Sequence, residues 1–171
     1  MKTTKLIAYS GLSVAVVTVV TMVVQIPIPQ TKGYINLGDA VILVFAMLFG
    51  AKIGMIGGGL GSALADILTG YAHWAPFTLI IKGIEGLIVG FFASKDMSAG
   101  KRVPILILAV LEMVFGYFLV GTRLYGMGAA LVEIPGNLLQ AGSAVIISLL
   151  LFYAIKRVEK VYTRDVYKRI K

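Results

Sequence analysis

Residues 36–92 read NLGDAVILVFAMLFGAKIGMIGGGLGSALADILTGYAHWAPFTLIIKGIEGLIVGFF, and the rest of the chain is organised around this stretch. It contains three apolar runs and more than half of the chain's 20 glycines. Four charged residues border or interrupt these runs: Asp39, Asp66, Lys82 and Glu85. A charged side chain inside a bilayer costs several kcal/mol unless it finds a partner or water. These positions are therefore the first candidates for function.

The composition is that of an integral membrane protein. Of the 171 residues, 58% are apolar and only 14% are charged, and the mean hydropathy is +0.92. A soluble domain is nearer half apolar and about a quarter charged, so this chain has too little polar surface for a soluble fold. The absence of cysteine excludes disulfides and cysteine–metal sites, and a single histidine argues against a zinc enzyme. We predict neither a metal nor a cofactor.

We predict an all-α fold with six transmembrane helices in a single membrane domain, because about 20 apolar residues span a bilayer. The helices are expected at residues 5–25, 39–49, 53–68, 76–93, 104–120 and 135–155, before a basic cytoplasmic tail at 156–171 that lies along the membrane surface. The second helix is short for a full crossing. Pro27 and Pro29 favour an extended loop over residues 25–38. The segment GTRLYGMGAALVEIP, from residue 121, is expected to be a glycine-rich loop with at most a partial turn.

The distribution of Lys and Arg predicts the orientation. Six spans place both termini on one side, and that side receives 13 of the 16 basic residues, including seven after Ala154. The other side receives Lys32 and Arg123, whereas Lys82 lies within a span. Cytoplasmic loops carry the excess of positive charge, so both termini should be cytoplasmic. The net charge of +8 is thus explained by membrane flanks and does not indicate nucleic acid binding.

A nucleotide site is not expected either. The segment GGGLGSALAD, residues 57–66, resembles a phosphate-binding loop in its glycines. It lacks the Lys-Ser/Thr pair of a P-loop, and no strand precedes it. Glycines in a membrane helix permit close helix packing instead.

In this orientation the polar residues of the spans gather in the outer half of the membrane. The residues concerned are Asp39, Asp66, Lys82, Glu133, Asn137 and Gln140, with Glu85 and Glu112 nearer the middle. The inner halves of the spans are almost purely apolar. The pattern predicts one polar pocket that opens to the outside, and it argues against a channel.

Spacing adds detail to this pocket. Glu133, Asn137 and Gln140 share one helix face, and amides offer both donors and acceptors to the edge of a heteroaromatic ring. Lys82 and Glu85 are three residues apart and can pair. Tyr71, His73 and Trp74 are candidates for a stacking surface, and Tyr34 and Asn36 are expected to face a ligand from the loop before the second helix.

Purely structural roles are open for the same residues. Lys82 can form a buried pair with Glu85 or with Glu112, and Trp74 can anchor the chain at the membrane interface. Asp39 and Asp66 lie near helix ends, where they can be solvated, and Asp39 can cap its helix. The residues Asn137 and Gln140 can serve interhelical hydrogen bonding alone.

The sequence resembles the S components of energy-coupling factor (ECF) transporters. The resemblance rests on INLGDAVILVFAMLFGAKIGMIGGGLGSALADIL at residues 35–68 and HWAPFTLIIKGIEGLIVGF at residues 73–91, within a small, basic, six-span chain. It covers most of the chain. The closest likeness is to the riboflavin-type group, which includes members for hydroxymethylpyrimidine or pyridoxine uptake.

The resemblance implies a transport mechanism in a prokaryotic plasma membrane. An S component binds a vitamin or precursor near the outer face and docks on a membrane scaffold subunit that carries two cytoplasmic ATPases. It then topples and brings its pocket to the cytoplasm. The loop after the first helix acts as a lid. An Ala-xxx-Ala face on that helix contacts the scaffold, and the equivalent face here, Ala8, Gly11 and Ala15, departs from strict Ala-xxx-Ala spacing.

Three functions are therefore compared. The favoured one is the substrate-binding subunit of a vitamin importer, with no enzyme activity of its own and with hydroxymethylpyrimidine or pyridoxine preferred to riboflavin. The second is a membrane assembly protein without a small-molecule ligand. The third is an intramembrane enzyme based on Glu85, Glu112 and His73, which would need a metal, a Ser–Lys dyad or a paired carboxylate at the same depth.

Overall fold

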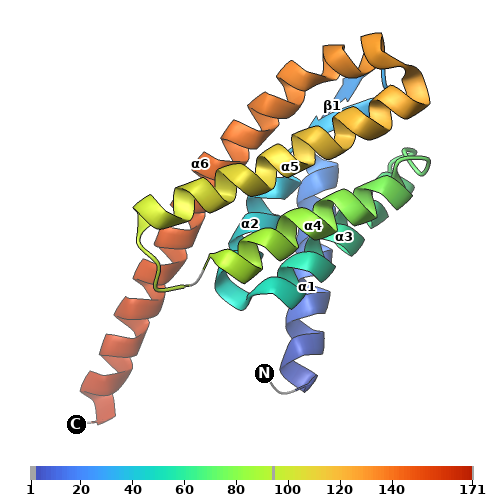
Figure 1. Cartoon of the computed structure of the whole chain (residues 1–171). Coiled ribbons are helices and arrows are strands. Elements are labelled where there is room, and N and C mark those ends of the chain that lie inside the picture. Colours follow the sequence, from blue (N-terminus) through green and yellow to red (C-terminus); the bar gives the residue numbers. More distant parts are fainter. Residues whose placement is uncertain (1–2, 94, 171) are drawn as a thin grey trace.

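The computed structural model describes residues 3–93 and 95–170, with side chains as far as residue 163. It contains six helices and one β-hairpin in the described part of the chain (Figure 1). The elements are α1 (Thr3–Val23), β1 (Gln25–Ile28), β2 (Gly33–Asn36), α2 (Gly38–Phe49), α3 (Ala51–Leu68), α4 (Ala75–Phe92), α5 (Ala99–Tyr125) and α6 (Met127–Ile170). The all-α prediction is confirmed.

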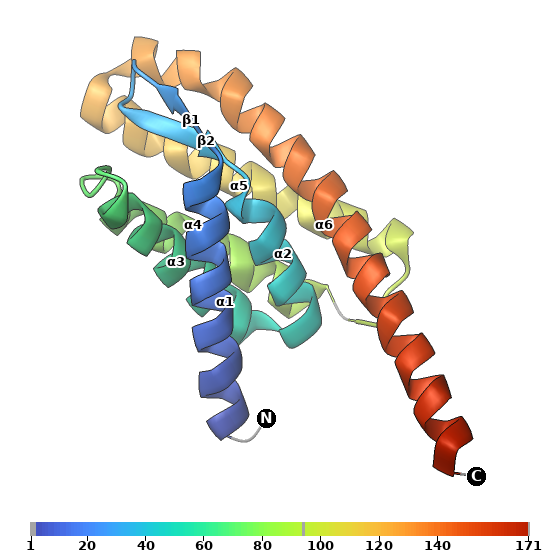
Figure 2. The ribbon, with the colours of Figure 1, turned by 180° about the vertical axis from the view of Figure 1, so that it is seen from behind.

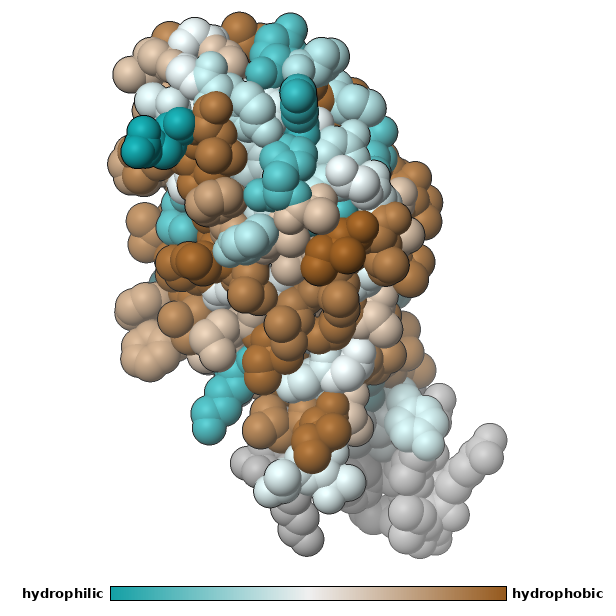
Figure 3. All heavy atoms as spheres, turned by 90° about the vertical axis from the view of Figure 1, so that its right-hand side faces the viewer, coloured by the Kyte–Doolittle hydropathy of each residue, from teal (hydrophilic) through white to brown (hydrophobic). Residues whose placement is uncertain are grey.

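Five of the described helices are long and apolar enough to cross a membrane. The sixth, α2, has 12 residues and is about 18 Å long at 1.5 Å per residue, which is shorter than a bilayer core. Hydrophobic residues cover most of the middle of the face shown in Figure 3, and hydrophilic residues gather toward its upper end. Large apolar side chains such as Phe91 and Leu139 are exposed, as expected where lipid is the solvent.

Glycines on α3 bring two neighbouring helices into backbone contact. A Cβ added at Gly58 would lie 2.4 Å from the carbonyl oxygen of Lys82 on α4, and one at Gly54 would lie 2.4 Å from that of Gly86. On the side facing α1, a Cβ at Gly57 would lie 2.0 Å from Oγ of Ser13. The close packing expected from the glycine-rich segment is therefore used on two faces of α3.

The α1 helix is polar on its inner side and apolar on its outer side. Thr18 Oγ1 donates to the carbonyl oxygen of Gly61 at 2.8 Å, and Thr21 is also buried. Ile7 and Val19 are exposed. The helix thus uses hydroxyl groups to pack against α3 and leaves its apolar side for lipid or a membrane partner.

The loop expected from residue 121 is instead helical. The α5 helix continues to Tyr125, α6 begins at Met127, and Gly126 makes the turn with φ +87°. Only this one position needs the left-handed conformation that glycine adopts freely. Pro135, expected to start the last helix, lies inside α6. The glycine content of the segment was therefore misleading as a loop signal.

The extended loop after α1 forms an antiparallel hairpin, in which Gln25 pairs with Asn36 and Ile28 pairs with Gly33. The hairpin lies beside the α5–α6 turn, at the end of the molecule opposite both described chain ends (Figure 2). The tail continues α6 as helix to Ile170. Of the basic residues counted for orientation, Lys2 and Lys171 lie outside the described residues. The cytoplasmic location of the termini remains a prediction.

Arg102 was counted among the cytoplasmic flanking charges, but it is fully buried. Its guanidinium lies 4.2 Å from the ring centroid of Phe152 and donates to the hydroxyl of Tyr153 at 2.8 Å. It also donates to the carbonyl oxygen of Lys95 at 3.2 Å. Arg102 therefore connects the α4–α5 loop, the start of α5 and the middle of α6.

Candidate functional site

A polar cavity lies beneath the hairpin, between β2 and the helices α1, α3, α4, α5 and α6. Its wall consists of Thr21, Gly33, Tyr34, Asn36, Ser62, Asp66, Trp74, Thr78, Lys82, Tyr117, Glu133 and Gln140. The volume open to the centre of a water molecule is about 20 Å³, which is room for about one water. The hairpin and the side chains around the cavity therefore leave little free space between them in this conformation.

Lys82 is held in a fully buried ion-pair cluster. Its Nζ donates to Oδ1 of Asp39 and lies 3.3 Å from Oε2 of Glu85, and all three side chains are at most 1% exposed. Solvation and capping of α2 were the alternatives left open for Asp39, and neither is observed, because its side chain is buried and Leu37 is the N-cap. Of the two partners proposed for Lys82, Glu85 forms an ion pair and Glu112 does not. Such a cluster persists in an apolar interior only while its charges compensate one another.

Gln140 connects this cluster to the hairpin. Its Nε2 donates to Oδ2 of Asp39 at 2.7 Å, and its Oε1 accepts the backbone N–H of Asn36 at 2.7 Å. The Asn36 side chain accepts in turn from the backbone N–H of Gly38 at 2.8 Å, at the start of α2. A single amide thus satisfies a donor and an acceptor from different elements.

Tyr34 and Asp66 join the hairpin to α3. The Tyr34 hydroxyl donates to Oδ1 of Asp66 at 2.6 Å. Burial, together with the nearby Asp66 charge, raises the pKa of the Tyr34 hydroxyl well above its usual value, so the phenol stays protonated and remains a donor. Solvation at the helix end was the alternative left open for Asp66, and the residue is instead only 2% exposed. Its Oδ2 has no hydrogen-bond partner among the described residues.

Glu133 lies on the α6 side of the cavity, next to β2. A Cβ added at Gly33 would lie 3.3 Å from Oε1 of Glu133, so the carboxylate rests against the hairpin backbone. The side chain is 4% exposed, and within the described part of the chain its Oε2 has no hydrogen-bond partner.

Aromatic side chains form another part of the wall. The rings of Trp74 and Tyr117 pack edge-on with centroids 5.6 Å apart. Trp74 Nε1 donates to the carbonyl oxygen of Thr31 at 3.2 Å, and the Tyr117 hydroxyl donates to Thr78 at 3.1 Å. With 3% of its surface exposed, Trp74 is a buried residue of the cavity and not an interfacial anchor.

Seven of the ten residues predicted to bind substrate lie on the wall of this cavity: Tyr34, Asn36, Asp66, Trp74, Lys82, Glu133 and Gln140. The other three do not lie on it. His73 is exposed beside Trp74 and Tyr125, Glu85 is buried in the ion-pair cluster, and Asn137 is buried on α6.

Sequence reasoning missed Thr21, Gly33, Ser62, Thr78 and Tyr117 on the wall. Hydroxyl groups within apolar spans are the signal that was available for four of them. That signal is weak, because Ser and Thr also satisfy backbone carbonyls in membrane helices, as Thr18 does.

The three residues predicted to dock on a scaffold share the outer side of α1. Ala8, Gly11 and Ala15 are exposed, and a Cβ added at Gly11 would meet nothing within 4 Å. The described residues contain no group of three or more His, Asp or Glu side chains arranged to hold a metal ion.

A bundle of apolar helices that encloses a polar cavity near one end is the architecture of a membrane-embedded binding protein. The family model described as "ECF-type riboflavin transporter, S component" matches residues 1–157. The chain therefore belongs to this family, and it is a multi-pass membrane protein. Membership of a transport family also argues against the intramembrane enzyme considered above.

Individual proteins are also similar to this chain in sequence. The chain is 47% identical over 141 residues to an uncharacterized protein of Pyrococcus woesei, covering 82% of this chain and 95% of that one. It is 33% identical over 132 residues to the thiamine precursor transporter HmpT of Lactococcus lactis, covering 77% of this chain and 75% of HmpT. A UPF0397 protein of Streptococcus agalactiae is 30% identical over 115 residues, which is 66% of this chain and 63% of that one.

Proposed function

We propose that this S component captures a small heteroaromatic vitamin or vitamin precursor in the cavity beneath the hairpin. The observation that carries the proposal is the composition of the wall: the Gln140 amide, two carboxylates with an unpaired oxygen and the Trp74–Tyr117 pair surround one space. Precisely placed polar groups beside aromatic surface are typical of sites that bind small ring compounds.

Hydroxymethylpyrimidine or pyridoxine is the favoured substrate. Both are single rings with hydroxymethyl groups, and the similarity to a thiamine precursor transporter supports the pyrimidine. Riboflavin is the second candidate because of the family to which the chain belongs. In this conformation the cavity has room for about one water, so any ring requires a displacement of the wall, and a single ring requires less of it than the three-ring isoalloxazine of riboflavin.

Import requires partners that the chain does not contain. We propose that it docks on a membrane scaffold subunit with two cytoplasmic ATPases, and that ATP hydrolysis on those subunits drives toppling of the S component. The exposed small residues on α1 support a helix–helix contact with the scaffold. The hairpin end is proposed to face outward for capture, in agreement with the basic residues near both termini.

The test is to identify the ligand of the purified chain. Bound small molecules are released by denaturation, identified by mass spectrometry and titrated into the protein by calorimetry. A pyrimidine or pyridine vitamin bound at nanomolar strength, with weaker binding in Gln140→Ala, is the expected result. Leu139→Ala is the companion variant, because Leu139 is exposed on the same helix and does not line the cavity. Failure of every vitamin to bind would favour a membrane assembly protein instead.

A further inference from the structure

Two buried carboxylates of the cavity each present an oxygen without a partner. Asp66 on α3 is 2% exposed, and Glu133 on α6 is 4% exposed. In the described part of the chain, Oδ2 of Asp66 and Oε2 of Glu133 have no hydrogen-bond partner, and both side chains line the cavity. Buried carboxylate oxygens are costly to leave unsatisfied, so these two acceptors point to a ligand that donates to them.

The charges around the cavity support the same conclusion. Among the described residues that line the cavity, Lys82 is the only cation, and it already pairs with Asp39 and Glu85. The positive charge of Lys82 also acts on Asp66, but two acids, Asp39 and Glu85, are already in direct contact with it. The described wall thus holds two carboxyl groups, and its one cation is already paired with acids that lie off the wall.

We propose that Asp66 and Glu133 are the specificity-determining acceptors of the cavity, which select a ring that carries amino donors or a positive charge and reject anionic ligands. This inference rests on the proposed function. Asp66 accepts a hydrogen bond from the ligand on the α3 side of the cavity, and Glu133 accepts one on the α6 side. The aromatic rings of Trp74 and Tyr117 line the same space. A ring whose amino group is replaced by an oxo group presents an acceptor to a carboxylate, and a phosphate ester adds like charge; both are disfavoured.

The same two residues connect ligand binding with the hairpin. Oδ1 of Asp66 already accepts from Tyr34, and Oε1 of Glu133 rests against Gly33. A ligand that donates to the free oxygen of each carboxylate does not compete for the oxygens that face the hairpin. A donor-rich ligand therefore satisfies oxygens that the protein alone leaves unpaired, while the space for its ring requires the hairpin to move.

The test compares three ligands on the full chain in detergent, with the fluorescence of Trp74, the chain's single tryptophan, as the readout. The probes are 4-amino-5-hydroxymethyl-2-methylpyrimidine, its 4-oxo analogue and its monophosphate ester. We expect the amine to bind at least about tenfold more tightly than either analogue, which is the range for a hydrogen bond to a charged group. This comparison requires no variant and is independent of any folding defect.

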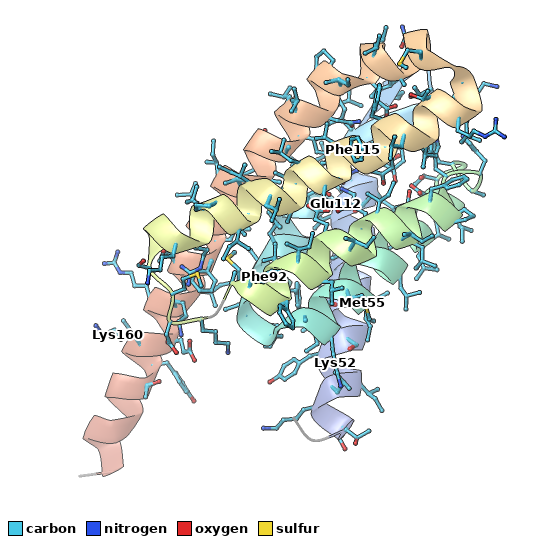
Figure 4. All side chains as sticks on the ribbon, in the orientation of Figure 1. Lys52, Met55, Phe92, Glu112, Phe115 and Lys160 are labelled. Carbon is cyan, nitrogen blue, oxygen red and sulfur yellow. The ribbon has the colours of Figure 1, made fainter. Side chains whose placement is uncertain are left out.

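Variants then test whether the preference for the 4-amino compound depends on Asp66 and Glu133. Asp66→Asn and Glu133→Gln keep the shape of the side chain and remove its charge. Each is expected to weaken binding of the 4-amino compound by about tenfold or more. Each should also reduce the ratio of the affinities for the 4-amino and 4-oxo compounds. The matched control is Glu112→Gln. Glu112 is a partly buried carboxyl on α5, between α5 and α4 in Figure 4, and it does not line the cavity. Its variant should bind like the unmodified chain.

The outcomes separate this inference from the function on which it rests. Equal binding of the amine and oxo compounds, tight binding of the phosphate ester, or undiminished binding by both variants would overturn the inference and leave the vitamin importer standing. Failure to bind any vitamin or precursor, riboflavin and pyridoxine included, would overturn both.

Discussion

Gln140 donates its side-chain N–H to Oδ2 of Asp39 at 2.7 Å, although 101 positions separate the two residues. The same Gln140 amide accepts the backbone N–H of Asn36 on the hairpin. The ion-pair cluster at Lys82 and the position of the hairpin are therefore linked through one side chain. A movement of the hairpin therefore disturbs the ion-pair cluster at Lys82, because the Gln140 amide cannot reorient without leaving a buried polar group unpaired.

Removal of the buried cation should strongly destabilise the protein. In Lys82→Met, Asp39 and Glu85 lose their counter-charge inside the bundle, and the expected cost is about 3–5 kcal/mol. The measurement is the melting temperature of the purified protein in detergent. Lys156→Met is the control, because the Lys156–Glu159 pair is solvent-exposed and worth at most about 1 kcal/mol. Similar melting temperatures for the two variants would contradict the structural role of the cluster.

Backbone contact between α3 and α4 should be sensitive to a single methyl group. In Gly54→Ala the new Cβ meets the carbonyl oxygen of Gly86 at 2.4 Å and Cβ of Ala46 at 2.7 Å, so the helices must separate. We expect a loss of about 1–3 kcal/mol of stability, measured by thermal unfolding. In Gly142→Ala the added atom meets nothing within 4 Å, and that variant should be neutral or up to about 1 kcal/mol more stable. If Gly54→Ala is as stable as Gly142→Ala, the close approach is not present.

The Tyr34–Asp66 hydrogen bond should hold the hairpin closed. Tyr34→Phe removes the donor to Asp66 and keeps the ring, so the backbone amides of residues 25–36 should exchange hydrogen about tenfold faster or more. Mass spectrometry of the hairpin peptides gives this rate. The control is Tyr162→Phe, an exposed tyrosine on the α6 tail, which should leave hairpin exchange unchanged. Unchanged exchange in both variants would show that other contacts close the hairpin.

The same hydrogen bond should persist into alkaline solution. The pKa of Tyr34 is raised in the folded protein, so the stability due to its protonated form is complete below its unfolded pKa and is lost progressively as the pH rises from that value through the higher folded value. The tyrosinate absorbance of the folded protein up to about pH 11 should therefore be the same in Tyr34→Phe as in the unmodified chain. In denaturant the variant should show one ionising tyrosine fewer. If the tyrosinate absorbance rises less in folded Tyr34→Phe than in the folded unmodified chain, then Tyr34 ionises in the usual range of tyrosine.

The outer side of α1 should be required for assembly and not for ligand capture. In Gly11→Leu the new side chain projects from the exposed face formed with Ala8 and Ala15 and should block a close helix–helix contact. We expect loss of co-purification with the scaffold and ATPase subunits and loss of uptake, with ligand affinity within about twofold of the unmodified chain. Gly142→Leu, at an exposed glycine on α6, is the matched control. Normal assembly of Gly11→Leu would place the docking surface elsewhere.

Much of the cavity was predictable because charge is conspicuous in an apolar sequence. Asp66, Lys82 and Glu133 stand out in any reading of the spans, and the positive-inside rule assigns them a common depth. The pairing of Lys82 with Asp39 was not predictable, since a helical pattern reports neighbours three or four residues away and Asp39 lies 43 positions earlier. The length of α5 was underestimated because glycine content was taken as a loop signal, although one glycine suffices for the turn.

The sequence by itself determined that this protein lies in a membrane, that its spans are helical and which charged residues are exceptional, because hydropathy and helical spacing are local properties. Only the tertiary structure decided which of those residues share a cavity and which compensate one another. His73 and Trp74 are adjacent in sequence, yet one is exposed and the other forms part of the wall. Contacts such as that between Gln140 and Asp39 depend on how α2 and α6 pack, and that packing is set by all the helices together.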